Sequence, residues 1–175
     1  DQNVILVDSV SKRYNLCGAR IGCMASHNKE VMAAALKFGQ SRLCPPVLGQ
    51  YAAMGALDTP DEYFDAVKAE YIARRDCAVE MLNAIPGVFA PKPLGAFYTI
   101  AELPVDSAES FCRWMLTDFR YEGATTMTTP VASFYKTPGE GTRQVRIAYV
   151  LEVPELKKAL HILAEGLKAY PGRLA

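Results

Sequence analysis

The chain has 175 residues, of which 50% are hydrophobic and 22% are charged, and its 19 basic side chains balance its 19 acidic ones. A zero net charge without a basic run excludes the electrostatic pattern of a nucleic-acid-binding protein. The sequence also has no apolar stretch of about 18 residues or more, which excludes a membrane-spanning helix. The sequence therefore predicts a globular protein with no nucleic-acid partner and no membrane partner.

The five cysteines are scattered along the sequence and form no Cys-x-x-Cys pair. An odd number of unclustered cysteines is typical of a reducing compartment, so we expect a cytoplasmic protein. The two histidines, His27 and His161, lie far apart and neither has an acidic cluster beside it. No metal site is therefore predicted.

The first 58 residues have the pattern of a strand pair followed by helices. The pattern predicts strands at 4–10 and 19–25 and helices at about 28–39 and 47–57. The continuous apolar run Val4–Val7 indicates that the first strand is buried, and a polar loop from Lys12 to Gly18 separates the strands. Because chains seldom begin at a core strand, we expect a fragment of a longer protein. Its residues before about 58 should be loosely packed or covered by another chain.

A long helix follows this first part of the chain. Thr59, Pro60 and Glu62 form a helix start, with an N-cap, a proline in the first turn and a capping box. Apolar residues then recur on one helical stripe: Phe64, Val67, Tyr71, Ala78, Leu82 and Ile85. About 25 residues at 1.5 Å per residue would span about 37 Å, enough to connect two domains.

The remaining residues predict a second domain of mixed strands and helices. Strands are expected at 88–90, 96–101, 124–129 and 144–150. One helix should be capped at Asp106–Glu109 and end at Gly123, and the last helix should begin at Pro154. The predicted fold class is α/β, with the remainder of a large α/β domain at 1–58. A connecting helix and a smaller α+β domain would occupy 59–175.

The stretch from Asp8 to Gly22 carries the most informative chemistry. Lys12 follows a strand, the hydroxyls of Ser9 and Ser11 flank it, and Arg20 lies on the return strand. A lysine amine can attack an aldehyde when it is neutral, and hydroxyls with a guanidinium can bind a phosphate. The set therefore suits an aldehyde cofactor with a phosphate group. Taken alone, the spacing favours a solvated loop lysine and a surface strand arginine.

Three segments of the sequence resemble the class I and II aminotransferases, which are fold type I pyridoxal-phosphate enzymes. They are Ser-x-Ser-Lys followed by Gly-x-Arg-x-Gly in residues 9–22, Gly-Ala-Phe-Tyr at 95–98, and Val-Arg-Ile-Ala-Tyr at 145–149. The resemblance implies that Lys12 forms the internal aldimine with pyridoxal 5'-phosphate and moves the proton of the substrate. It also implies that Ser9, Ser11 and Arg20 bind the cofactor phosphate.

The resemblance assigns substrate binding to arginines. Arg146 would bind the α-carboxylate of the amino acid, with Arg143 as the competing candidate. Arg42 lies in a loop that approaches the partner's active site in dimers of this family. There it could bind a second carboxylate and favour a substrate such as aspartate. An exposed loop arginine without a ligand fits the same pattern.

The implied function is that of a pyridoxal-phosphate-dependent aminotransferase, similar to aspartate aminotransferase, which uses amino-acid and 2-oxo-acid substrates as a homodimer. In the family, several cofactor contacts come from the preceding half of the chain, including the aspartate on the pyridine nitrogen. We therefore expect the fragment alone to be inactive. Two alternatives stay open: a lyase or decarboxylase that uses the same cofactor and fold, and a non-catalytic binding or dimerisation module.

Overall fold

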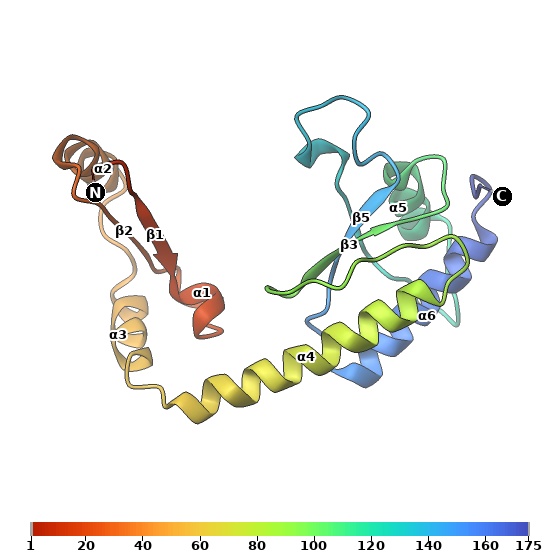
Figure 1. Cartoon of the computed structure of the whole chain (residues 1–175), viewed down its shortest axis with the longest axis horizontal. Helices are drawn as coiled ribbons and strands as arrows, with labels where there is room; N and C mark the ends of the chain where they lie inside the picture. The colour runs from red at the N-terminus through yellow and green to blue at the C-terminus, as the bar shows by residue number, and fades with distance from the viewer. Residues whose placement is uncertain (1, 175) are drawn as a thin grey trace. The chain divides into compact units, whose positions relative to one another are not determined.

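The computed structural model describes residues 2–174, and the chain divides into two units, Asp1–Tyr63 and Phe64–Ala175 (Figure 1). The first unit contains two strands, three helices and one 3-10 turn. In chain order they are β1 (Leu6–Ser9), α1 (Val10–Arg13), η1 (Cys17–Ala19), β2 (Gly22–Ala25), α2 (Lys29–Ser41) and α3 (Val47–Ala56). The strands pair antiparallel, from Leu6 with Ala25 to Ser9 with Gly22.

The helices of the first unit confirm the predictions at 28–39 and 47–57. Asn28 caps α2, because its side-chain oxygen accepts the Val31 N–H at 3.1 Å. The strands are shorter than predicted, since α1 takes over at Val10 and η1 occupies part of the expected loop from Lys12 to Gly18. Local hydrogen bonds form these turns, and the apolar pattern of the strands does not reveal them.

The prediction that Val4–Val7 is buried is wrong for the described chain. The four side chains are 49–75% exposed, and α2 has no buried residue. A two-stranded ribbon cannot form a hydrophobic core by itself, because it needs a third strand or a helix packed on its face. The first unit is thus loosely packed, as expected for the residues before about 58.

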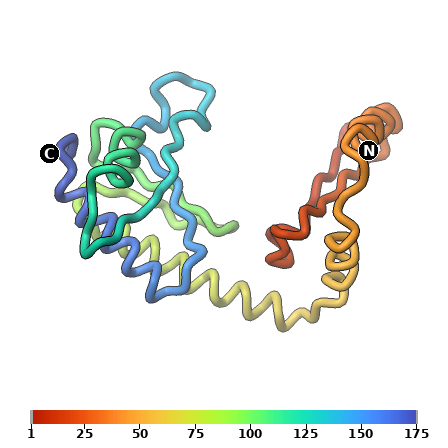
Figure 2. Tube along the Cα trace, turned by 180° about the vertical axis from the view of Figure 1, so that it is seen from behind, coloured from red at the N-terminus to blue at the C-terminus, as the bar shows by residue number. Residues whose placement is uncertain are grey.

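The second unit is built on an antiparallel sheet of order β3-β5-β4, formed by Tyr98–Glu102, Gln144–Ala148 and Thr129–Pro130. Its helices are α4 (Asp61–Asn83, which starts in the first unit), α5 (Ala108–Thr117) and α6 (Val153–Ala169). A short 3-10 turn, η2 (Ala132–Phe134), follows β4. Helices α4 and α6 lie next to each other, and residues from both line one surface groove (Figures 1 and 2).

The core of the second unit follows the predicted helical stripes. Leucines 156, 160, 163 and 167 of α6 are at most 2% exposed. Ala78 and Leu82 on α4 are buried as well, as is Ile85 just after the helix, whereas the earlier members of that stripe are half-buried. Helical periodicity therefore identified the buried faces of both helices.

Several predicted boundaries in this unit are wrong. Helix α5 ends at Thr117, and Gly123 lies in a separate turn with φ +79° that links Tyr121 and Ala124. The predicted strand at 124–129 is reduced to β4, and the one at 88–90 to a single bridge from Phe89 to Glu102. Pairing partners decide the length of a strand, and these partners are distant in sequence.

Between residues 2 and 174, no helix is both long enough and apolar enough to cross a membrane. The same part of the chain holds no group of three or more histidine, cysteine or acidic side chains arranged to bind a metal.

Candidate cofactor and carboxylate sites

Ser9, Ser11 and Lys12 lie where β1 passes into α1. Ser9 has an extended backbone and caps α1, and its Oγ accepts the Ser11 N–H at 3.1 Å. The two hydroxyl oxygens are 2.9 Å apart. Lys12 follows within α1 and is exposed. An N-cap serine explains why a helix starts here, so local structure alone brings the hydroxyls and the amine together.

Arg20 lies at the same end of the strand pair, because Gly22, two residues later, pairs with Ser9. Its backbone is left-handed, with φ 57°, and its Nη1 donates to the Cys17 carbonyl at 2.8 Å. Of the five N–H donors of a guanidinium, this bond occupies one. The others can bind an anion.

The turn that carries Arg20 is held by close backbone contacts. A Cβ on Gly49 of α3 would lie 2.3 Å from the Ala19 carbonyl oxygen, so only glycine allows α3 to approach this turn. A Cβ on Gly22 would lie 2.9 Å from the Asp8 carbonyl oxygen. The position of Arg20 is thus fixed by packing on both sides.

These groups fit an aldehyde cofactor with a phosphate. The amine of Lys12, the two hydroxyls and the guanidinium of Arg20 all lie at one end of the strand pair, and each is the donor type that such a ligand needs. The Ile21 carbonyl, 3.1 Å from Ser9 Oγ, can accept the single proton of that hydroxyl. The Ser11 hydroxyl is therefore the better phosphate donor of the two.

A cavity of about 340 Å³ lies in the same unit and borders these groups, because Ser9 is one of its lining residues. Its lining is mainly apolar and includes Val10, Ile21, Met54 and Leu57, but neither Lys12 nor Arg20. The cavity therefore adjoins the candidate cofactor site at Ser9, but it does not reach Lys12 or Arg20.

Arg146 is half-buried on β5 of the second unit. The predicted alternation is confirmed, because Val145, Ile147 and Tyr149 are at most 6% exposed and Arg146 points to the opposite face. Its Cζ lies 4.6 Å from the centre of the Tyr98 ring and 5.4 Å from that of Phe134. Within residues 2–174, no carboxylate forms an ion pair with Arg146. Its guanidinium is therefore held by rings and keeps its N–H groups for a ligand.

The competing candidate, Arg143, is already paired. Its Nη2 lies 2.6 Å from Oε1 of Glu102 on β3. Arg42 is the C-terminal cap residue of α2 and is exposed, and in the described chain no carboxylate lies within ion-pairing distance of it. Among these arginines, Arg146 has the surroundings best suited to a carboxylate ligand.

The comparisons with known proteins agree with these motifs. Residues 1–163 match the family model described as "Aminotransferase class I and II". The chain belongs to this family. It is 30% identical to an aspartate aminotransferase of Rhizobium meliloti over 91% of its length, and it spans 40% of that relative.

Solved aminotransferase structures show the same fold. An alanine aminotransferase from Pyrococcus furiosus has a TM-score of 0.79 at 28% identity, over 95% of this chain and 42% of that one. An α-aminoadipate aminotransferase from Thermus thermophilus, complexed with N-(5'-phosphopyridoxyl)-L-leucine, has a TM-score of 0.81 at 23% identity, over 95% and 42%. The chain thus spans about two fifths of the length of these aminotransferases.

Sequence reasoning missed the aromatic residues around Arg146. Tyr98 is part of the Gly-Ala-Phe-Tyr segment that resembles the family, but its contact with the guanidinium depends on the register that pairs Ile100 with Arg146. Phe134 lies in the loop after β4, and no spacing in the sequence links it to Arg146. A search for aromatic residues near a candidate arginine would have needed the strand pairing first.

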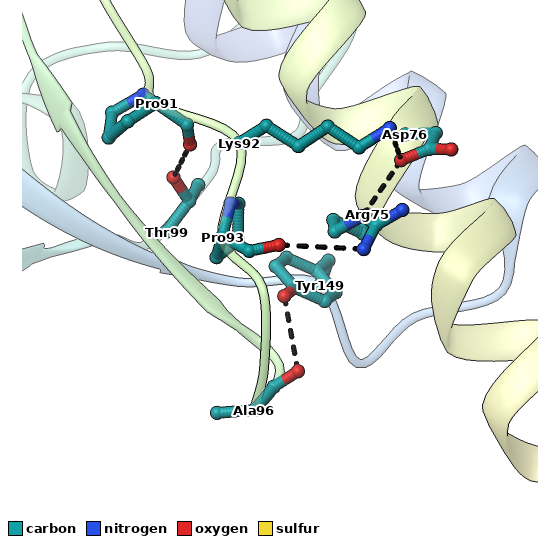
Figure 3. Close-up of polar contacts among 8 residues, drawn as sticks. All are labelled: Arg75, Asp76, Pro91, Lys92, Pro93, Ala96, Thr99 and Tyr149. Carbon is teal, nitrogen blue, oxygen red and sulfur yellow. Dashed lines mark hydrogen bonds and ion pairs between the residues drawn. The ribbon is translucent and has the colours of Figure 1, made fainter.

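A polar network on the segment 91–96 was missed as well (Figure 3). Lys92 and Arg75 both pair with Asp76, at 2.9 and 2.8 Å. These contacts lower the pKa of Asp76 from 3.8 to about 2, and the hydrogen bond from Arg75 makes the largest contribution. Burial raises the pKa of Tyr149, whose hydroxyl donates to the Ala96 carbonyl at 3.2 Å.

Proposed function

We propose that this chain supplies the cofactor-binding lysine and the carboxylate-binding arginine of a pyridoxal-phosphate-dependent aminotransferase, which transfers an amino group between an L-amino acid and a 2-oxo acid. The observation that carries the proposal is the grouping of Lys12, Ser11 and Arg20 at one end of the β1–β2 pair, in a chain that belongs to the family. Aspartate is the donor we favour, because the Rhizobium meliloti relative is named an aspartate aminotransferase.

Each residue has a defined task in this proposal. The amine of Lys12 would hold the cofactor and would move the proton at the substrate Cα. Arg20, Ser11 and Ser9 hold the phosphate, and Arg146 binds the α-carboxylate through two parallel N–H donors. When bound, the cofactor supplies the electron sink that stabilises negative charge at Cα.

The remaining parts of the proposal concern organisation. Residues 1–58 would belong to the large cofactor-binding domain, and 59–175 to a connecting helix and the small domain. We infer a homodimer in which Arg42 reaches toward the partner's site, and the exposed apolar side chains of the first unit support such a contact. A cytoplasmic location is supported by the cysteines, which are all free thiols.

The decisive experiment is borohydride reduction of the full-length gene product loaded with pyridoxal phosphate, followed by peptide mass spectrometry. We expect the pyridoxyl group on Lys12, and its loss in a Lys12→Ala variant. Lys29→Ala, which removes an exposed lysine of the same unit, is the matched control and should leave the label in place. A label on another lysine, or no label, would contradict the proposal. Supplying L-aspartate with 2-oxoglutarate and detecting glutamate then separates transamination from a lyase or decarboxylase reaction.

A further inference from the structure

The chain enters β3 through a left-handed turn that Tyr149 holds in place. Ala96, two residues before the strand, has φ +56°, a backbone conformation that is unfavourable for a residue with a Cβ. The hydroxyl of Tyr149 donates to the Ala96 carbonyl at 3.2 Å (Figure 3). The Tyr149 backbone N–H donates to the Phe97 carbonyl at 3.1 Å. Tyr149 is 1% exposed, so these bonds are made from the core of the unit.

The residue that follows this turn is the ring partner of Arg146. Tyr98 is the first residue of β3 and pairs with Ala148, which immediately precedes Tyr149 on the neighbouring chain segment. Its ring centre lies 4.6 Å from the Arg146 Cζ. Because side chains alternate along β5, Tyr149 points into the core and Arg146 points away from it. Tyr149 therefore contacts the residues just before Tyr98, the ring partner of Arg146, from the face of the sheet opposite to Arg146.

The other end of the segment is anchored too. Thr99, which is 3% exposed, donates through its hydroxyl to the Pro91 carbonyl at 3.1 Å. Lys92 pairs with Asp76 on α4 at 2.9 Å, and Arg75 Nη1 lies 3.5 Å from the Pro93 carbonyl. Between these anchors Leu94 is 98% exposed, so the turn has no packing of its own at its tip. The polar contacts hold the segment together with the Phe97 ring, which packs against the core and against Tyr71.

We propose that Tyr149 is a positioning residue for Arg146: its buried hydroxyl fixes the turn at Ala96, and this turn places the Tyr98 ring against the guanidinium. The inference rests on the proposed function, in which Arg146 binds the α-carboxylate. It adds that the strength of carboxylate binding depends on a side chain that touches neither the arginine nor the ligand. A planar guanidinium must be aligned with the carboxylate to form both bonds, so a loosened ring partner weakens binding.

The test uses Tyr149→Phe in the full-length gene product, loaded with pyridoxal phosphate. The dissociation constant and the saturating rate are measured in single-turnover half-reactions. The donors are the L-amino acid that the wild-type protein turns over fastest and the primary amine that lacks only its α-carboxylate. For the amino acid we expect the dissociation constant to rise roughly two- to tenfold, because this is the change that the loss of one hydrogen bond typically causes. The saturating rate and the dissociation constant of the amine should stay unchanged.

Tyr170→Phe is the matched control. The Tyr170 hydroxyl is also held within this unit and donates to Asp106 Oδ1 at 2.9 Å. In the part of the chain that the structure describes, no hydrogen bond or ring contact links Tyr170 to the segment 91–96. If both variants raise the dissociation constant equally, Tyr149 has only a structural role and the inference is wrong. It is also wrong if Tyr149→Phe leaves amino-acid binding unchanged while Arg146→Leu weakens it, and the proposed function then stands. If Arg146→Leu itself changes nothing, the proposed role of Arg146 fails, and the inference fails with it.

Discussion

Arg146 and Tyr98 lie on the same face of two paired strands, with the Arg146 Cζ 4.6 Å from the centre of the Tyr98 ring. The ring attracts the cation through its π face and does not use the N–H groups at the edge of the guanidinium. These N–H groups can then bind a planar carboxylate through two parallel bonds. The contact therefore orients the arginine and leaves its charge unpaired, whereas an acidic partner would neutralise it.

Replacing Arg146 with Leu in the full-length gene product should weaken amino-acid binding roughly tenfold or more, because hydrogen bonds to a charged group are lost. The absorbance of the bound cofactor should not change, since Lys12, Ser11 and Arg20, and not Arg146, are the residues proposed to hold it. Arg146→Lys should restore binding only in part, because an ammonium cannot form the bidentate contact. Titration with the amino acid, followed by absorbance, measures both variants.

Phe134→Leu should raise the dissociation constant of the amino acid by roughly two- to fivefold, because a ring facing a partly exposed cation contributes modestly. Phe89→Leu is the control, since Phe89 is 66% exposed and, within residues 2–174, its ring is not one of those that face Arg146. Equal effects from the two variants would show that the Phe134 ring does not hold the guanidinium.

Lys12→Ala should abolish transamination, because no other group takes over both the covalent attachment and the proton transfer. The first unit should keep its structure, since Lys12 is exposed and the cap on α1 comes from Ser9. A coupled assay for glutamate formation measures the loss, and circular dichroism checks the fold. Turnover close to the wild-type rate would rule out this role for Lys12.

The acid sensitivity of the second unit should depend on Asp76. Its pKa is about 2 in the folded chain against an ordinary value of 3.8, so the folded state favours the ionised carboxylate. This contribution is complete above about pH 4 and is lost as the pH falls from 3.8 toward 2. Asp76→Asn should therefore flatten the pH dependence of the free energy of unfolding in that range. Urea unfolding at pH 2, 3, 4 and 6 measures it, and an unchanged profile would contradict the ion-pair network.

Leu163→Ala should destabilise the second unit by about 2–5 kcal/mol, because it leaves a cavity in a packed core. Leu163 is 0% exposed and lies on the buried face of α6. Leu94→Ala removes the same atoms from a side chain that is 98% exposed, and it should change the free energy of unfolding very little. Denaturant unfolding of both variants gives the comparison.

The helices could be predicted because their signals are local. Asn28 and Ser107 cap their helices through contacts within three residues, and the leucine stripe of α6 repeats within single turns. The strands were predicted less well, because β4 pairs with β5 across more than ten residues of loop and the pattern at 124–129 does not reveal where pairing starts. The burial of Val4–Val7 could not be read from the residues either, because burial depends on what covers the strand.

The sequence by itself predicted that Ser9, Ser11, Lys12 and Arg20 lie close together, because short-range turns bring residues at this spacing to one end of the strand pair. It also determined that Arg146 faces away from the core, since alternation along a strand needs no knowledge of the partner strands. Only the tertiary structure showed that Arg143 is paired with an acidic side chain and Arg146 is not, and only it showed the contacts of Tyr98, Phe134 and Tyr149. These contacts join residues that are distant along the chain, and the register of the β3–β5 pair sets which of them meet.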